Sequence, residues 1–176
     1  MQRFEYTDHQ MTRLTDPEGI LYLQNLYDAE GRVVEQIDAS GSHDYFNYDT
    51  EGQTPFTDNL GHQTQDSYDD LGRVTETVDA LGNGEQFVYD DDYNVTTYTD
   101  RRGNAWHYEY DDRGNVTRSE CPTGCVTTYT YNETNDLTSV TDALERTITY
   151  VWENGNLVRI ERPDGTAFTY TYDEHG

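Results

Sequence analysis

Lysine is absent from this chain, and basic residues of any kind are few. The 176 residues contain 11 basic residues, all of them Arg, against 35 Asp and Glu, which gives a formal net charge of −24 at pH 7. A protein that binds nucleic acid or an anionic membrane surface needs clustered positive charge to contact phosphates. We therefore expect neither nucleic acid nor an anionic membrane surface as a partner.

Long hydrophobic runs are also absent. No apolar stretch approaches the ~20 residues that a membrane-spanning helix needs, so we expect no membrane span. Hydrophobic residues make up 33% of the chain and the mean hydropathy is −0.99, values low enough to raise disorder as a possibility. However, 16 Tyr, 5 Phe and 2 Trp are present. Aromatic residues favour strands and bury large surfaces, which argues against disorder.

The aromatic residues recur at a constant spacing. We take the second tyrosine of Tyr108-Glu109-Tyr110-Asp111 as the anchor of a repeat. Equivalent anchors are Tyr6, Tyr27, Tyr48, Tyr68, Tyr89, Tyr110, Tyr131, Trp152 and Tyr172, each 20 or 21 residues after the one before it. Such self-similarity is the signature of a repeat protein. It predicts that residues 1–176 form a single array of about eight repeats.

Each repeat has the pattern strand, turn, strand, loop. In the first strand a second aromatic residue precedes the anchor by two positions, as in Tyr108 and Tyr110, which places both rings on one face. We expect the rings of adjacent repeats to lie in cross-strand register and to form a ladder that holds the sheet together. An apolar residue such as Val116 begins the second strand. The pattern predicts an all-β fold, an antiparallel β-meander of ~21-residue hairpin repeats with roughly sixteen short strands and no helix.

The turn after the anchor has the sequence Asp-x-x-Gly. The aspartate can accept hydrogen bonds from the backbone two residues on, and glycine adopts the positive φ that closes the turn. The structural repeat positions are Tyr27, Asp28, Gly31, Tyr48, Asp49, Gly52, Tyr68, Asp69, Gly72, Tyr89, Asp90, Tyr110, Asp111, Gly114, Tyr131, Tyr172 and Asp173. In other repeats Asn94, Asn135 and Asn156 lie at or near the glycine position, where asparagine is the next-best residue. A second Asp-x-x-Gly loop, such as Asp79–Gly82, closes the repeat.

The motif Tyr-Asp-x-x-Gly-Arg/Asn, followed by an apolar residue and then by Asp-x-x-Gly, is similar to the YD repeat of the RHS family. The best matches run from Tyr27 to Gly41, from Tyr68 to Gly82 and from Tyr110 to Asn115. The family includes bacterial RHS polymorphic toxins, C subunits of insecticidal toxin complexes, wall-associated bacterial proteins and teneurins. The resemblance implies a strip of β-sheet that curves or spirals into a hollow shell.

Shells of this family usually contain many more repeats than this chain. The sequence ends at Gly176, which falls at the glycine position of a ninth turn. We therefore expect the 176 residues to be a fragment of a longer protein.

The two cysteines, Cys121 and Cys125, occur in the loop Cys-Pro-Thr-Gly-Cys, where they replace the aspartate of the second loop and the residue after its glycine. The ends of a tight loop can approach within the ~4.4–6.8 Å Cα separation of a disulfide. A disulfide and two free thiols are both open interpretations. A zinc site is a third, although such a site needs about four ligands and the chain has no second cysteine pair.

Candidate chemistry elsewhere is sparse. The triplet Asp90-Asp91-Asp92 offers carboxylates that suit calcium, but the EF-hand spacing is missing, so we expect no cofactor and keep calcium as an alternative. The segment Asp16-Pro17-Glu18-Gly19 resembles the Asp-Pro-x-Gly-Leu segment at the self-cleaving end of RHS cores. Its aspartate and glycine fall where other repeats have their second loop, so we interpret it as a turn and name no catalytic residue.

We predict a non-enzymatic structural segment of an RHS/YD-repeat shell or extracellular stalk that encloses, carries or displays a toxin or effector domain. Its partners would be the remaining repeats and effector domain of the parent protein, with self-association through sheet edges, and its location secreted or at the cell surface. A second hypothesis is an adhesion or carbohydrate-binding module that binds a glycan through the aromatic face. A third is an acidic decoy or immunity-like protein that binds a basic toxin through its charge.

Overall fold

The computed structural model describes residues 2–173, and within this range all regular secondary structure is β-strand. The chain divides into two compact units, with the division after Glu85. The all-β prediction is confirmed, with 17 strands in the described residues where about sixteen were expected.

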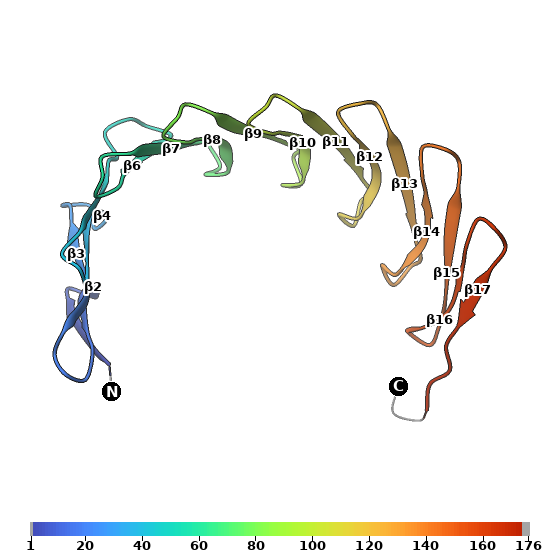
Figure 1. The fold of residues 1–176 in the computed structure, drawn as a ribbon, viewed down its shortest axis with the longest axis horizontal. Helices are drawn as coiled ribbons and strands as arrows, with labels where there is room; N and C mark the ends of the chain where they lie inside the picture. Colours follow the sequence, from blue (N-terminus) through green and yellow to red (C-terminus); the bar gives the residue numbers. More distant parts are fainter. Residues whose placement is uncertain (1, 174–176) are drawn as a thin grey trace. The chain divides into compact units, whose positions relative to one another are not determined.

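The first unit is a meander in which each strand pairs antiparallel with the next one along the chain (Figure 1). Its strands are β1 (Arg3–Thr7), β2 (Gln10–Thr15), β3 (Leu21–Tyr27), β4 (Val33–Asp38), β5 (His43–Phe46), β6 (Gln53–Thr57), β7 (Gln63–Tyr68) and β8 (Val74–Val78). The second unit follows the same rule. It contains most of β9 (Gly84–Tyr89), then β10 (Val95–Thr99), β11 (Ala105–Tyr110), β12 (Val116–Glu120), β13 (Val126–Tyr131), β14 (Leu137–Thr141), β15 (Thr147–Glu153), β16 (Asn156–Glu161) and β17 (Ala167–Thr169).

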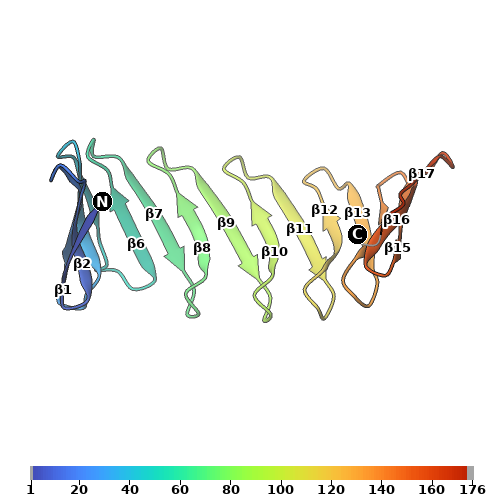
Figure 2. The same ribbon diagram turned by 90° about the horizontal axis from the view of Figure 1, so that it is seen from below.

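Turns join consecutive strands, alternately at one end of the strands and at the other (Figure 2). Within each unit the strands change direction progressively, so each sheet is curved (Figure 1). The antiparallel meander and its curvature were both predicted. A right-handed strand twist that accumulates from one hairpin to the next accounts for the bending.

Alternation of side chains explains why these residues form strands. In β11 the rings of Trp106, Tyr108 and Tyr110 are half-buried, whereas His107 and Glu109 between them are exposed. Successive side chains of a strand point to opposite faces, so the three rings share one face of the sheet. The aromatic face predicted from the two-residue spacing is present.

The predicted register of the rings is wrong. β11 pairs with β10 and β12, so the anchor strands of successive repeats lie two strands, or about 9.5 Å, apart. A ring of the second strand completes the row instead. The ring centroid of Tyr98, on β10, lies 5.4 Å from that of Phe87 and 5.5 Å from that of Trp106. Aromatic pairing therefore joins the two kinds of strand rather than one anchor to the next.

Neither unit has a buried hydrophobic core. Within residues 2–173 no hydrophobic side chain is buried, and the only buried residues are Thr15 and Asn25, each 8% exposed. Leu81, at the tip of a turn, is 88% exposed. A repeat protein in which each strand contacts mainly its neighbours can be ordered without a central core, which accounts for the low mean hydropathy.

Candidate functional site

Six anchor side chains each bind the repeat that precedes them. The hydroxyl of Tyr110 on β11 donates a hydrogen bond of 2.8 Å to the carbonyl oxygen of Val95, the first residue of β10. Burial raises the pKa of Tyr110, which keeps the phenol protonated as a donor. Equivalent bonds run from Tyr27 to Met11, Tyr48 to Val33, Tyr131 to Val116, Trp152 to Leu137 and Tyr172 to Leu157. Trp152 substitutes for tyrosine because its indole Nε1–H donates the same bond, at 2.8 Å.

The turn after the anchor is closed by the aspartate that follows it. One carboxylate oxygen of Asp111, Oδ1, accepts hydrogen bonds from the backbone N–H of Arg113 at 3.0 Å and of Asn115 at 2.9 Å. Its other oxygen, Oδ2, accepts from Asn115 Nδ2 at 3.0 Å. These bonds, the Asn115 side chain first and the backbone N–H groups next, lower the pKa of Asp111 to about 2. Gly114 completes the turn with a φ of +82°.

The same arrangement recurs in other first turns. Asp28, Asp69 and Asp90 each accept two backbone N–H bonds, from the residues two and four positions on. Asp49 differs. β5 ends at Phe46, Tyr48 lies beyond the strand, and the backbone N–H of Asp49 donates to Asn47 Oδ1 at 2.7 Å. The turn predicted after Asp173 includes residues 174–176, which lie outside the described residues.

The three asparagines expected at or near the glycine position occupy different places in their turns. Asn135 has the expected positive φ, 67°. In the turn from Asp90, however, Tyr93 takes the left-handed position with a φ of 69°, and Asn94 follows it and donates from Nδ2 to Asp90 Oδ2 at 3.0 Å. Asn156 is the first residue of β16.

That repeat uses a shorter connection. Asn154 and Gly155 form a two-residue turn in which both φ angles are positive, 52° and 80°. Asn-Gly is the preferred sequence for a hairpin of this length, because its twist matches that of the paired strands.

The second loops, at the other ends of the strands from the first turns, use the same turn. Asp100 Oδ1 accepts from the backbone N–H of Arg102 at 2.8 Å and of Asn104 at 2.9 Å. Asp16, Asp38, Asp58, Asp79 and Asp142 make the corresponding bonds. The segment that resembles a self-cleaving site, 16–19, is thus a regular turn of the array.

The fifth position of the turn has a role that sequence reasoning missed. Its backbone N–H caps the aspartate, and its side chain often binds the second carboxylate oxygen, as Arg73 Nε does to Asp69 Oδ2 at 2.7 Å. The signal was visible in the motif, since arginine or asparagine follows the glycine in several repeats. Only the folded turn shows that this side chain reaches back to the aspartate.

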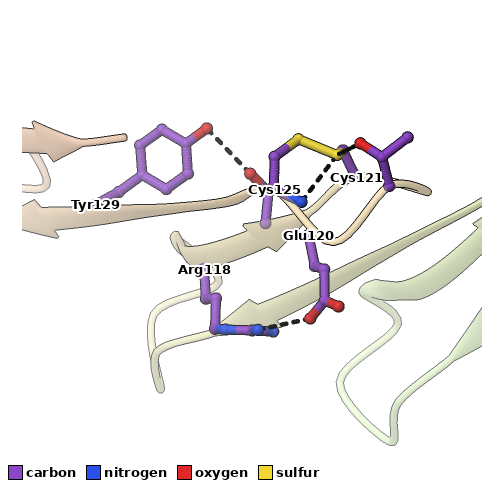
Figure 3. The surroundings of a disulfide bond; sticks show 7 residues. Arg118, Glu120, Cys121, Cys125 and Tyr129 are labelled. Atoms are coloured by element: carbon purple, nitrogen blue, oxygen red, sulfur yellow. Dashed lines mark hydrogen bonds and ion pairs between the residues drawn. A yellow bond between two sulfur atoms is a disulfide. The ribbon is translucent and has the colours of Figure 1, made fainter. Parts of the chain in front are cut away.

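Cys121 and Cys125 form a disulfide in the structure, with a Cα–Cα distance of 5.2 Å (Figure 3). The loop keeps the backbone bonds of the aspartate turns, because Cys121 N–H donates to the Cys125 carbonyl and Gly124 N–H to the Cys121 carbonyl, both at 2.9 Å. The backbone N–H of Cys125 also donates to Cys121 Sγ at 3.1 Å. The sulfur of Cys121 therefore stands where other turns have the carboxylate oxygen.

An open concavity of about 530 Å³ lies beside the disulfide on the aromatic face. Its lining includes both cysteines and the rings of Trp106, Tyr108 and Tyr129. The concavity arises where Ser119 of β12 and Thr127 of β13 occupy positions that are aromatic or aliphatic in neighbouring rows.

Residues 2–173 contain no group of three or more His, Cys, Asp or Glu side chains placed to hold a metal ion. In the triplet 90–92, Asp90 is engaged by the turn. No helix that is long and apolar enough to cross a membrane is found in the described part of the chain.

Comparison with known proteins adds to this geometry. Residues 151–176 match the family described as RHS Repeat. This segment of the chain is similar to an RHS repeat. This confirms the resemblance, because the matched segment carries the anchors Trp152 and Tyr172 of the same period that runs through the rest of the sequence.

Solved structures show the same fold at low sequence identity. The crystal structure of TcdB2-TccC3 without its hypervariable C-terminal region matches 94% of this chain with a TM-score of 0.74 and 18% identity. TcdB2-TccC3-Cdc42 matches 98% with a TM-score of 0.72 and 15% identity. The Photorhabdus luminescens Tc holotoxin pore matches 92% with a TM-score of 0.68 and 14% identity.

This chain spans only 10%, 11% and 10% of those three chains. A search of curated proteins finds no match.

Proposed function

We propose that this RHS array is a structural wall segment of a larger shell that encloses, carries or displays an effector domain. One observation carries the proposal: every paired strand binds the next strand in sequence, and no hydrophobic side chain among residues 2–173 is buried. Such a sheet lengthens by the addition of hairpins instead of closing around a core of its own. The likeness to about a tenth of the TcdB2-TccC3 structures supports this role.

The proposal gives each repeated residue a mechanical role. The anchor hydroxyls bind the preceding repeat on one face, and the aspartate turns fix the hairpin length at both edges. Specific recognition would then reside in other domains of the parent protein, and no catalytic step is assigned to these repeats. We propose a secreted or cell-surface location for the parent, as part of a larger assembly.

Deletions within the complete parent protein test the role of a wall. Removal of residues 112–132, one full period, joins Asp111 to Glu133 and preserves both the turn pattern and the antiparallel alternation of strands. Removal of 112–122 deletes a single strand and reverses the direction of every later strand relative to the earlier ones. We expect the first deletion to leave the effector domain resistant to protease and the second to expose it.

Equal protease sensitivity of the effector domain in both deletions, with an undamaged array, would contradict the proposed wall. A parent protein that contains no domain besides repeats, and no hollow particle by electron microscopy, would do so as well.

The concavity supports a second candidate, the carbohydrate-binding module. Trp106, Tyr108 and Tyr129 supply ring faces for stacking, and the hydroxyls of Ser119 and Thr127 supply hydrogen bonds. Glycan-array binding that is lost in Tyr108→Ala and kept in Tyr150→Ala, an equivalent ring outside the concavity, would favour it. Salt-sensitive binding to a basic protein would instead favour the decoy hypothesis.

A further inference from the structure

The loop of Cys121 and Cys125 directs its hydrogen-bond donors at one sulfur of the pair. The backbone N–H of Cys125 lies 3.1 Å from Cys121 Sγ, and the hydroxyl of Thr123 lies 3.0 Å from the same atom (Figure 3). These are the donor positions, four and two residues on, that serve the carboxylate of an aspartate turn. The two sulfurs of this disulfide therefore occupy unequal environments.

The turn is built to hold a negative charge at the first position. In the preceding second loop, the Asn104 side chain and the backbone N–H groups of Asn104 and Arg102 lower the pKa of Asp100. Anionic sulfur is stabilised by N–H donors in the same way, as at other low-pKa thiolates. Cys121 is thus the better placed of the two to carry charge when the S–S bond breaks.

Access favours attack on the other sulfur. Cys125 is exposed, whereas Cys121 is half-buried. Both line the open concavity, which gives a small thiol a route to the bond.

The acid nearest to Cys121 in sequence is engaged by an arginine. Glu120 directly precedes Cys121, so its side chain points to the opposite face of the sheet. It forms a 2.5 Å ion pair with Arg118 (Figure 3). The neighbouring second loops contribute charges of both signs: Asp100, Arg101 and Arg102 in the preceding loop, and Asp142, Glu145 and Arg146 in the following one. Arg146 lies 2.6 Å from the carboxylate of Asp142.

We propose that the Cys121–Cys125 disulfide is a thiol–disulfide exchange site, with Cys125 as the attacked sulfur and Cys121 as the leaving group. An external low-molecular-weight thiolate, of the glutathione class, attacks Cys125 Sγ and forms a mixed disulfide there. The Cys121–Cys125 bond breaks, and its electron pair leaves on Cys121 Sγ as a thiolate. A second thiol then attacks the mixed disulfide, so that two external thiols are oxidised to one disulfide while both cysteines are reduced.

The site is reversible because the turn does not depend on the S–S bond. The backbone bonds between Cys121 and Cys125 and between Gly124 and Cys121 are those of the aspartate turns, which have no disulfide. After reduction the Cys121 thiolate can take the place of the carboxylate. This inference concerns one loop and stands whether or not the array is a shell wall.

Trapping with glutathione tests the assignment. The oxidised protein is incubated with glutathione at pH 7, quenched with N-ethylmaleimide and mapped by fragment mass spectrometry, in which cleavage before Pro122 separates the two cysteines. We expect glutathione on Cys125 and N-ethylmaleimide on Cys121 in at least about tenfold excess over the reverse. Glutathione mainly on Cys121, or no adduct under conditions that modify the protein unfolded in urea, would overturn the proposal.

Single-cysteine variants give a second measurement. At pH 7 iodoacetamide should alkylate Cys121 in Cys125→Ser faster than Cys125 in Cys121→Ser. We expect a ratio of about three for each tenfold difference in thiolate fraction, because nucleophilicity falls as basicity falls. Equal or inverted rates, in variants with unchanged circular dichroism, would also overturn it.

The double variant Cys121→Asp with Cys125→Asn restores the residues found in the Asp100 turn and is the matched control for the loop. It should match the oxidised wild type in thermal stability and be unaffected by dithiothreitol. A large loss of stability in this variant would show that the loop differs from the aspartate turns and would remove the basis of the proposal.

Discussion

Replacement of Tyr110 by phenylalanine separates the anchor hydrogen bond from the packing of the ring. The change deletes only the hydroxyl that donates to the carbonyl of Val95 at 2.8 Å. A hydrogen bond of this kind contributes about 0.5–1.5 kcal/mol net, and the Val95 carbonyl would lose a partner at a half-buried position. We expect Tyr110→Phe to lower the free energy of unfolding by about 1 kcal/mol, which corresponds to about 2–4 °C in Tm for a chain of this length.

Tyr108 provides the matched control. It lies two residues away on the same strand and the same face, is also half-buried, and its hydroxyl makes no hydrogen bond within residues 2–173. Tyr108→Phe should therefore change the free energy of unfolding by less than about 0.5 kcal/mol. Urea denaturation followed by tyrosine and tryptophan fluorescence measures both. Equal losses in the two variants would refute the argument that the anchor acts through its hydroxyl.

Three further outcomes follow from the turns and anchors. Residues 145 and 103 both have positive φ, 61° and 80°. In thermal melts Glu145→Gly should therefore stabilise the protein by about 0.5–1 kcal/mol, and Gly103→Ala should destabilise it by a similar amount. The space around Gly103 is open, so the effect of the alanine comes from the backbone conformation and not from a clash. Because the folded-state pKa of Asp111 is lowered to about 2 from 3.8, its stabilising contribution is complete above pH ~4 and is lost as pH falls toward 2. Acid titration of unfolding should show this loss in the wild type and less of it in Asp111→Asn. Trp152→Phe should cost about 1 kcal/mol in urea denaturation, since the bond to the Leu137 carbonyl is removed, whereas Trp152→Tyr should cost less, since tyrosine supplies the donor in other repeats.

The period and local chemistry of the sequence were sufficient to predict the fold. An anchor such as Tyr110 marks a strand because aromatic residues two apart share a face, and the following Asp-x-x-Gly marks a turn. Both inferences depend on neighbours within one repeat, where spacing determines geometry. The same reasoning placed Cys121 and Cys125 in the second-loop turn, although the sequence left three states of the pair open.

The errors concern relations between repeats and the exact alignment of irregular turns. The cross-strand ladder of rings failed because the intervening second strand separates one anchor strand from the next, so Tyr98 fills the row. Tyr93 was missed because a bulky residue at positive φ is unfavourable by about 1–2 kcal/mol, and only the aspartate capping of the turn from Asp90 shows why it is tolerated there. Propensity alone assigns such a position to asparagine.

Order in this array arises from three kinds of bond between neighbours. The strand ladder joins adjacent strands, and the anchor hydroxyl of Tyr131 joins its strand to Val116, at the start of the previous repeat's second strand. Between the first turns that begin at Asp111 and Asn132, Arg113 donates to the carbonyl of Asn132 at 2.7 Å and Asn115 donates to Asn135 at 3.0 Å, so these two turns are also joined. A single hairpin keeps only the ladder between its own two strands, and the other bonds depend on neighbouring repeats. Because the strand ladder recurs in every repeat and six anchors make the bond to the preceding repeat, a further repeat can be added without requiring a new core.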